Sequence, residues 1–401
     1  MRKLISRRSV LSGMGLGAAA LSAPGWAQGH NVHSGSHGRG GPLIPAGFDE
    51  VSGEVINLSV GSGHRIVEGR RGPGIAVNGS VPGPLIRLRE GQNVRLNVTN
   101  TLDVDTSVHW HGLLVPFQMD GVPGISFPGI KPGKTFTYEF PIRQSGTYSG
   151  LQEQSGHYGP LIIEPKDGEP IAVDRDYILL VSDFTTLDPH FIMKRLRTGE
   201  HHFNRQMNTW TDDYPMSGPE RRMWAEMRMM PTDIMDISAP TYTFLANGRG
   251  PNERLEYLFA PGERVRLRII NGSAQSFFNI RIPGLPMTVI AADGQNVRPV
   301  EVDEFQIGTA ETYDVILEPG AAEAYAIVAE SMDRSGMALA MLTSRPGARA
   351  KVPALRDPPL LTMADMGMNH GSEGGTGHGG MDHSAMTHDA VDHGKLGHGA
   401  A

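Results

Sequence analysis

Two histidines separated by one residue are the strongest chemical signal in this sequence. His109 and His111 stand in the segment Val-His-Trp-His-Gly, residues 108–112. Alternate side chains of a β-strand point to the same face, so both imidazoles would face one side and Trp110 the other. Imidazole nitrogens bind copper, zinc and iron. The pair is therefore a candidate site for one metal ion or for two adjacent ions.

The sequence contains no cysteine, which limits the copper chemistry that it can support. A blue copper centre needs a thiolate ligand, so these residues cannot build one. The absence of cysteine also excludes disulfides, but it leaves the redox compartment open. The histidine pair is equipped to hold copper, whereas the thiolate part of a copper electron-transfer path is missing.

A second group of candidate ligands follows Thr362, where His and Met residues stand among Gly, Asp and Ser. Such a segment cannot form a core, so we predict that residues 346–401 are a linker and a disordered tail. Imidazole and thioether groups together suit both Cu(II) and Cu(I). The alternative is an inert low-complexity tail. The candidate copper ligands of the tail are Met363, Met366, Met368, His370, His378, Met381, His383, Met386 and His388.

The N-terminus has the features of an export signal. Arg7 and Arg8 precede a short apolar run rich in Gly and Ala, so we predict a twin-arginine (Tat) signal peptide at residues 1–27 and a periplasmic location. Residues 28–45 are predicted to form a flexible leader. This run is too short and too rich in glycine to span a bilayer, and no later segment is apolar enough, so no membrane span is expected. A formal net charge of -7 argues against nucleic acid as a partner.

The rest of the sequence alternates in the manner of half-buried strands. Val94, Leu96 and Val98 are separated by polar residues, and so are the aromatic residues of segment 136–140. Period two indicates strands with one face in a core. Pro- and Gly-rich turns lie between such segments. We therefore predict an all-β fold.

One β unit occurs twice. Residues 91–100 recur in similar form as residues 262–271, and the Asn-Gly pair at Asn78 has a counterpart at Asn247. Two copies of one unit predict tandem β-sandwich domains. The part of the second copy that matches the histidine pair lies near residues 279–282 and has no histidine.

The two domains are predicted at residues 46–170 and 171–345. A methionine-rich insertion at residues 193–236 interrupts the strand pattern of the second domain. It has two interpretations, a soft thioether surface for Cu(I) or methionines that fill gaps in a core. Three of its methionines stand at helical spacing: Met223, Met227 and Met230.

These motifs together resemble those of the multicopper oxidases, specifically the periplasmic copper-resistance type. The resemblance covers nearly the whole chain after the leader. The matching segments are residues 78–84, 91–100, 108–113, 119–123, 144–148, 159–165 and 311–315.

The resemblance implies cupredoxin-like (plastocyanin-like) Greek-key β-sandwich domains and a copper-dependent oxidation of Cu(I) or phenols coupled to reduction of O2 to water. It implies that His109 binds the type 2 copper, that His111 binds a type 3 copper and that Asp120 assists proton supply. The alternative for Asp120 is a turn-forming role before Gly121. The expected partners are copper ions, as Cu(I) or Cu(II), O2 if the chain is active, and other copper-resistance proteins of the periplasm.

The sequence departs from the family pattern in two places. After Gly-Thr-Tyr the family has a second His-x-His motif, whereas here Tyr148 is followed by Ser149 and Gly150. His157 lies past this point, at a spacing that does not replace a pair. The last domain of the family, which supplies further histidines and the type 1 cysteine, has no counterpart before the His- and Met-rich segment.

Two functional hypotheses follow from these departures. In the first, the family function holds, and the chain is a copper oxidase of copper tolerance. In the second, the chain is a catalytically inactive, truncated relative that sequesters copper through its His- and Met-rich segments. A hydrolase is not indicated, because the sequence has neither a Gly-x-Ser-x-Gly elbow nor a His-Glu-x-x-His helix. Two-domain copper enzymes are disfavoured, because they also need a cysteine-bearing site.

Overall fold

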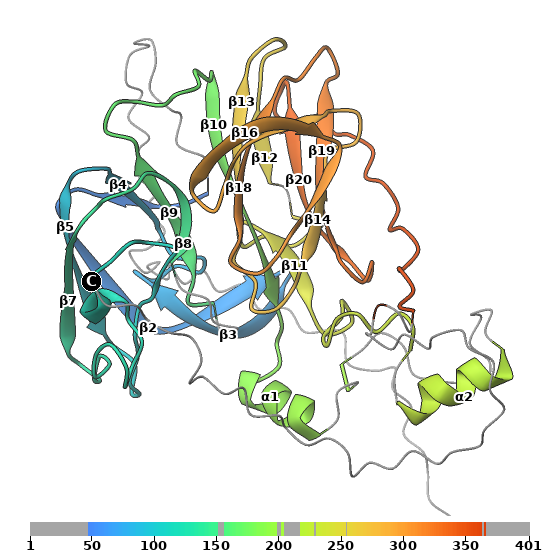
Figure 1. Ribbon diagram of the computed structural model, residues 1–401, viewed down its shortest axis with the longest axis horizontal. Helices are drawn as coiled ribbons and strands as arrows, with labels where there is room; N and C mark the ends of the chain where they lie inside the picture. The colour runs from blue at the N-terminus through green and yellow to red at the C-terminus, as the bar shows by residue number, and fades with distance from the viewer. Residues whose placement is uncertain are drawn as a thin grey trace, which may run out of the picture. The chain divides into compact units, whose positions relative to one another are not determined.

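The fold is mostly β, as the alternation of the sequence predicts. The computed structural model describes residues 47–150, 156–198, 202–203, 217–227, 230–253, 255–362 and 365. The predicted signal peptide, the leader and all the candidate ligands of the tail lie outside these residues. The described strands form four sheets, which are drawn in Figure 1.

The first two sheets belong to the N-terminal part of the chain and carry the histidine pair. Their strand orders are β1-β4-β9-β8-β6 and β3-β2-β5-β7. The strands of the first are β1 (Glu50–Ser52), β4 (Leu85–Arg89), β9 (Gly159–Glu164), β8 (Gly146–Gly150) and β6 (Trp110–His111). Those of the second are β3 (Arg70–Val77), β2 (Val55–Val67), β5 (Asn93–Asn100) and β7 (Thr135–Pro141).

The other two sheets have the orders β11-β10-β13-β18-β15-β16 and β12-β20-β19-β14-β17. The strands of the larger sheet are β11 (Thr243–Ala246), β10 (Arg175–Phe184), β13 (Val265–Asn271), β18 (Thr312–Leu317), β15 (Met287–Ala292) and β16 (Gln295–Val302). Those of the smaller sheet are β12 (Glu256–Leu258), β20 (Met337–Thr343), β19 (Ala324–Ser331), β14 (Phe278–Arg281) and β17 (Glu304–Ile307).

The internal repeat of the sequence is visible in the strand order. The order β4-β9-β8-β6 recurs as β12-β20-β19-β14, and β3-β2-β5-β7 recurs as β11-β10-β13-β18. The pairs β4–β9 and β12–β20 are parallel in both copies, and so are β2–β5 and β10–β13. The strand that corresponds to β6 is β14, which has no histidine. The predicted domain boundaries, at residues 46–170 and 171–345, stay a prediction.

The two Asn-Gly pairs perform the same task in both copies. Asn78 and Asn247 have positive φ angles of 50° and 48°, which asparagine tolerates better than most residues. The Oδ1 atom of Asn78 accepts a hydrogen bond from the amide of Ser59 at 2.7 Å, and that of Asn247 accepts one from the amide of Leu180 at 2.7 Å. Each asparagine thus ties a turn to the long strand beside it, which explains why the pair recurs.

The predicted strand alternation is confirmed in the first core. Val94, Leu96 and Val98 on β5 are buried, and the polar residues between them face outward or are half-buried. Tyr138 on the neighbouring strand β7 and Trp110 on β6 lie in the same core, and their rings meet edge to face with centroids 5.4 Å apart. The core therefore holds β6 through its tryptophan.

The strand β8 links the first core to the larger sheet of the second pair. The hydroxyl of Thr147 donates to Oδ1 of Asp314 at 2.7 Å, and the guanidinium of Arg268 donates to Thr147 at 3.1 Å. The backbone oxygen of Thr147 accepts from the hydroxyl of Thr312 at 2.9 Å. Because β8 also pairs with β6, this buried polar network bears on the strand that carries His111.

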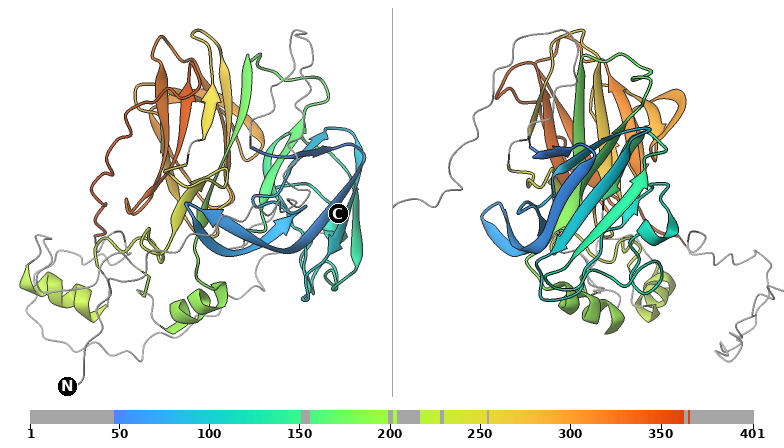
Figure 2. Two further views of the ribbon diagram at one scale, coloured as in Figure 1. Left: turned by 180° about the vertical axis from the view of Figure 1, so that it is seen from behind. Right: turned by 90° about the vertical axis from the view of Figure 1, so that its left-hand side faces the viewer.

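The β2–β3 hairpin makes a second connection of this kind, and its blue ribbon is easily followed in both views of Figure 2. The carboxylate of Glu68 accepts a hydrogen bond from the amide of Asn252 at 2.8 Å. The guanidinium of Arg65 lies over the ring of Phe184, 4.9 Å from its centroid. The hairpin and β8 together join the two pairs of sheets.

The methionine-rich insertion contains two short helices, α1 (Pro189–Thr198) and α2 (Gly218–Glu226). The buried residue of α2 is Trp224, and Met223 is only half-buried. Met230 and Met235 are buried, so these two fit the gap-filling interpretation. No helix among the described residues is long and apolar enough to cross a membrane.

Candidate metal centre

The histidine pair lies at the start of a very short strand. In β6, Trp110 pairs with Gly150 and His111 pairs with Ser149 of β8. Trp110 is buried, whereas the side chain of His109 is 40% exposed. The two imidazole rings have centroids 5.5 Å apart and are nearly perpendicular. The structure therefore brings the two predicted ligands together, while the tryptophan between them points into the core.

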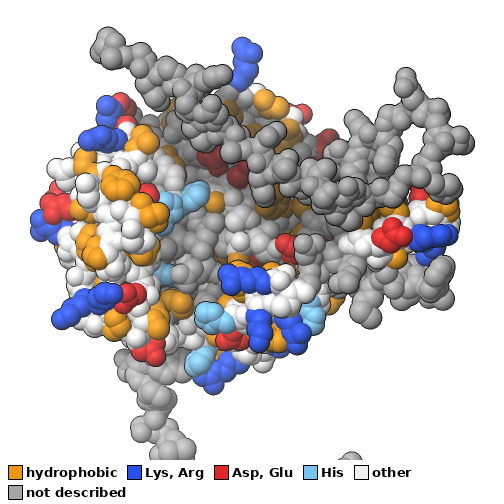
Figure 3. Space-filling view, turned by 60° about the horizontal axis from the view of Figure 1, so that its bottom comes forward, with side chains coloured by type: hydrophobic (Ala, Val, Ile, Leu, Met, Phe, Trp, Pro, Cys, Tyr) orange, Lys and Arg blue, Asp and Glu red, His pale blue; other side chains and the backbone are white. Residues whose placement is uncertain are grey.

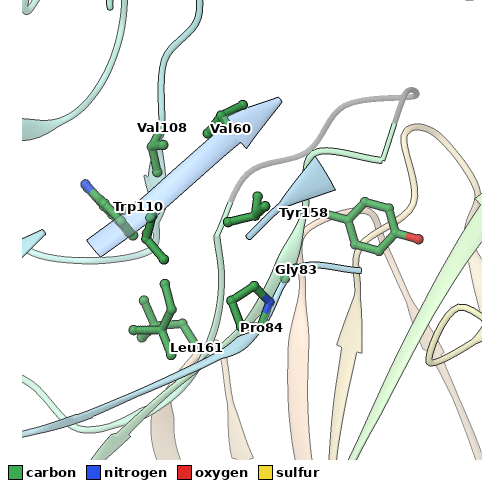
Figure 4. Close-up of a pocket in the computed structure, with 11 residues that line it drawn as sticks. Val60, Gly83, Pro84, Val108, Trp110, Tyr158 and Leu161 are labelled. Atoms are coloured by element: carbon green, nitrogen blue, oxygen red, sulfur yellow. The ribbon is translucent and has the colours of Figure 1, made fainter. Parts of the chain in front are cut away.

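The core side of β6 is not a ligand site. A small cavity of about 30 Å³ lies next to Trp110, and its walls are almost entirely apolar. In Figure 4, Trp110 and Tyr158 lie at opposite ends of the group of side chains that line it, with Pro84 and Leu161 between them. An apolar gap of this size has no groups that could orient a ligand. The chemistry of this segment belongs to the histidine face.

The ring of His109 is held by the backbone of Asp120. Its Nδ1 atom lies 2.7 Å from the Asp120 carbonyl oxygen and 3.5 Å from Oδ1 of the same residue. A carbonyl can only accept, so Nδ1 carries the proton in this bond, and the lone pair of a neutral ring is on Nε2. A metal-binding histidine usually donates its second N–H to such a partner. His109 is thus prepared to bind a metal through Nε2.

Asp120 combines the two roles that its sequence allowed. It caps the short 3-10 helix η1 (Phe117–Met119), so it is a turn residue, and its carboxylate lies close to His109. The next residue, Gly121, has a φ of +82°, and a Cβ atom there would collide with the carbonyl of Val108. Only glycine allows this turn to pack against the strand that leads to His109.

His111 faces a different environment, a cavity of about 280 Å³. Burial lowers the pKa of His111, the neighbouring His109 lowers it further, and the carboxylate of Asp293 opposes both effects. The ring is therefore neutral at pH 7, which is the form that binds metals. Besides His111, the cavity is lined by Gly112, Tyr148, Ser149, Asp293, Thr309, Ala310, Glu311 and Thr312.

Sequence reasoning did not find the polar residues of this cavity. Asp293 stands before Gly294 in a turn with a φ of +47°, so its only signal in the sequence was that of a turn. Ser149 carried no signal except the departure from the family motif. Both residues reach His111 through the packing of β8 against the second pair of sheets, which no local pattern reveals.

His157 is the other histidine of interest in this region. It is completely buried, and neither ring nitrogen has a hydrogen-bond partner in the described part of the chain. Burial lowers the pKa of His157 to about 4. Buried polar groups without a partner are rare in folded proteins, so this imidazole is neutral and weakens the fold when it is protonated.

Other histidines are not grouped in this way. On the face shown in Figure 3, described histidine side chains reach the surface at separate places among charged and apolar residues. What distinguishes the pair at His109 and His111 is the short distance between the rings and the fixed orientation of one of them.

The described residues fit copper as two ligands and not as a complete cluster. Among them, no three His, Asp or Glu side chains come together to hold a metal ion. Two imidazoles with one free Nε2 suit one copper ion with open coordination positions. A copper ion bound there would supply a redox centre. The candidate ligands of the tail, from Met363 to His388, lie outside the described residues.

Known proteins with similar sequences are copper resistance proteins. Copper resistance protein A of Pseudomonas syringae pv. tomato is 46% identical over 389 residues, which cover 93% of this chain and 61% of that protein. The Escherichia coli protein of the same name is 45% identical over 388 residues, with coverages of 93% and 61%. This chain therefore spans about three fifths of the length of these relatives.

Solved structures confirm the predicted cupredoxin-like fold. The blue copper oxidase from Nitrosomonas europaea gives a TM-score of 0.55 at 26% identity and covers 73% of this chain and 86% of that one. The laccase from Botrytis aclada gives a TM-score of 0.57 at 26% identity, with coverages of 79% and 56%. Sequence models of the multicopper oxidases match residues 59–168 and 198–346. The chain belongs to the multicopper oxidase family.

Proposed function

We propose that this chain binds copper in bacterial copper resistance, with His109 and His111 as ligands. The observation that carries the proposal is the hydrogen bond between Nδ1 of His109 and the carbonyl of Asp120, which leaves Nε2 available to a metal. The neutral state of His111 supports it. The names of the similar proteins from Pseudomonas syringae and Escherichia coli support the physiological role.

The reaction of the family, oxidation of Cu(I) or phenols coupled to reduction of O2, is a second candidate function. Family membership and the position of Asp120 beside His109 favour it. Against it stands the absence of cysteine from the sequence, since the family takes electrons from its substrate through a thiolate-bound copper. We therefore place copper binding first. The His- and Met-rich tail would then add capacity for both oxidation states.

The proposed location is the periplasm, reached by the twin-arginine pathway. Arg7 and Arg8 precede an apolar run of the kind that this pathway recognises. Replacing both arginines by lysine is expected to keep the protein in the cytoplasmic fraction of cells that export the original chain. Recovery of the variant from the periplasm would contradict the proposed route.

Copper stoichiometry tests the binding function. We expect the His109→Gln, His111→Gln double variant to bind less copper than the original chain at equal free copper. The variant His64→Gln, which changes an exposed histidine on β2, is the matched control and should bind as the original chain does. Equal copper in all three proteins would contradict the proposed site. Oxygen uptake with Cu(I) or a phenol separates the two functions, because binding alone consumes no O2.

A further inference from the structure

The cavity beside His111 has walls from distant parts of the chain. Tyr148 and Ser149 come from β8, Asp293 comes from the turn between β15 and β16, and residues 309–312 come from the segment that leads into β18. Its volume of about 280 Å³ exceeds that of a packing gap. The cavity lies on a different side of the pair from Asp120, which holds His109.

The lining of this cavity has one sign of charge. Asp293 and Glu311 contribute two carboxylates, and no Lys or Arg is among the lining residues. One oxygen of each carboxylate is held by the backbone, since Asp293 accepts from the amide of Thr312 at 3.0 Å and Glu311 accepts from the amide of Gly308 at 2.6 Å. The acids are therefore fixed in place, and they favour a cation over an anion or a neutral molecule.

Two hydroxyl groups of the cavity lack a hydrogen-bond partner, which points independently to a ligand. The side chain of Ser149 is 1% exposed, and its Oγ atom has no partner in the described part of the chain. The Oγ1 atom of Thr309 is also buried without one. A buried hydroxyl left unpaired costs about 1–3 kcal/mol. Ser149 pairs directly with His111 in the β6–β8 ladder, so the unpaired hydroxyl and the imidazole lie at the same place.

We propose that this cavity is a second copper site, which holds a hydrated Cu(II) ion with one nitrogen of His111 as its protein ligand. Asp293 and Glu311 accept hydrogen bonds from the water shell, and the hydroxyls of Ser149 and Thr309 complete it. The inference rests on the proposed copper-binding function and adds where copper waits next to the pair.

A hydrated ion fits the geometry better than a bare one. The described residues contain no group of three His, Asp or Glu side chains arranged to hold a metal directly. Six waters at about 30 Å³ each need about 180 Å³, which is less than the volume of the cavity. Carboxylates that contact an ion through water act as outer partners, and such partners typically change metal affinity by about 10- to 100-fold.

The test titrates Cu(II) alone into the full chain with 15N-labelled histidine and follows the imidazole resonances of His109 and His111, which paramagnetic Cu(II) broadens. The two resonances are assigned by His109→Gln and His111→Gln. In the variant Asp293→Asn, Glu311→Gln, we expect broadening of His111 to need about tenfold more Cu(II), while that of His109 is unchanged. Both substitutions keep an oxygen acceptor for the backbone amides. The control Asp303→Asn removes an exposed acid of the same sheet pair and should behave as the original chain does.

A second variant separates a ligand site from a packing defect. If the hydroxyl of Ser149 only lacks a partner, Ser149→Ala stabilises the protein and leaves the copper titration unchanged, and the proposal is wrong. If the hydroxyl contacts the hydrated ion, Ser149→Ala weakens the response of His111 to copper. Equal titrations of His111 in the acid variant and the original chain would also overturn the second site. Failure of both histidines to respond in the original chain would instead overturn the copper-binding function itself.

Discussion

The Nδ1 atom of His109 lies 2.7 Å from the backbone carbonyl oxygen of Asp120. This contact sets the tautomer of the ring and directs Nε2 away from the turn, as in metal sites where a second partner orients the ligand. The carbonyl is placed by the turn at Gly121, so the orientation of the ligand depends on the backbone and not on an acidic side chain. A conservative change of the Asp120 side chain therefore leaves this hydrogen bond in place.

Gly121→Ala is expected to disturb the site and the fold together. Its positive φ and the collision of a Cβ with the carbonyl of Val108 make the native turn inaccessible. We expect a loss of about 2 kcal/mol or more in the free energy of unfolding, measured by urea denaturation, with weaker copper binding. Gly124→Ala is the matched control, because Gly124 also has a positive φ, of +76°, but has open space at its Cβ. It should cost only about 1 kcal/mol. Equal losses in both variants would contradict the role of the Val108 contact.

Arg268→Met tests the buried ion network between β8 and the larger sheet. Arg268 donates to Asp176 at 2.8 Å and lies 3.3 Å from Asp314. Removing its charge leaves two buried carboxylates without this partner, and we expect a loss of about 3 kcal/mol or more. Arg95→Met breaks an exposed pair with Glu139 and should cost less than about 1 kcal/mol. A loss from Arg268→Met as small as that of the control would show that the network does not hold the sheets.

Stability should fall with acidification because of His157. Its pKa in the folded chain is about 4, below the ordinary value of 6.5, so the unfolded chain binds more protons between these values. The stability from the neutral ring is fully present above pH 6.5 and is lost as the pH falls toward 4, by about 3 kcal/mol in total. His157→Leu is expected to reduce the difference in urea midpoint between pH 7 and pH 5. His64→Gln, at an exposed site, should leave it unchanged. An unchanged pH dependence in His157→Leu would contradict the assignment.

The tail can be tested by removing residues 363–401. The last described anchors lie before it, since the guanidinium of Arg356 binds Glu304 at 2.8 Å and the amide of Leu361 donates to Pro231 at 2.6 Å. We expect the shortened chain to keep its circular dichroism spectrum and to lose most of its bound copper, because the tail carries the larger number of candidate ligands. Unchanged copper after removal would rule out a sequestering role for the tail.

Local patterns in the sequence predicted the strands and the repeat correctly. The alternation at Val94, Leu96 and Val98 reports one buried face directly, and the Asn-Gly pairs report turns that need a positive φ. These features depend on neighbouring residues only. The methionines of the insertion show the limit of a periodic signal, because Met230 lies beyond the end of α2 and the residue buried by that helix is Trp224.

The candidate site could be predicted only in part. The His-x-His motif identified both histidines, because a period of two is a local property. Asp293, Glu311 and Ser149 could not be found, because they meet His111 through the β6–β8 ladder and the contact of Thr147 with Asp314. Likewise, the sequence directed attention to the carboxylate of Asp120, whereas the shortest contact with His109 is made by its backbone carbonyl.

Electron paramagnetic resonance of Cu(II) bound to the chain that lacks residues 363–401 tests the central claim most directly. With one Cu(II) per chain, we predict the spectrum of an ordinary, non-blue copper centre with hyperfine coupling to imidazole nitrogen. That coupling should be lost in the His109→Gln, His111→Gln variant and retained in His64→Gln. The same nitrogen coupling in the double variant would show that copper binds elsewhere, and the account of this histidine pair as the copper site would be wrong.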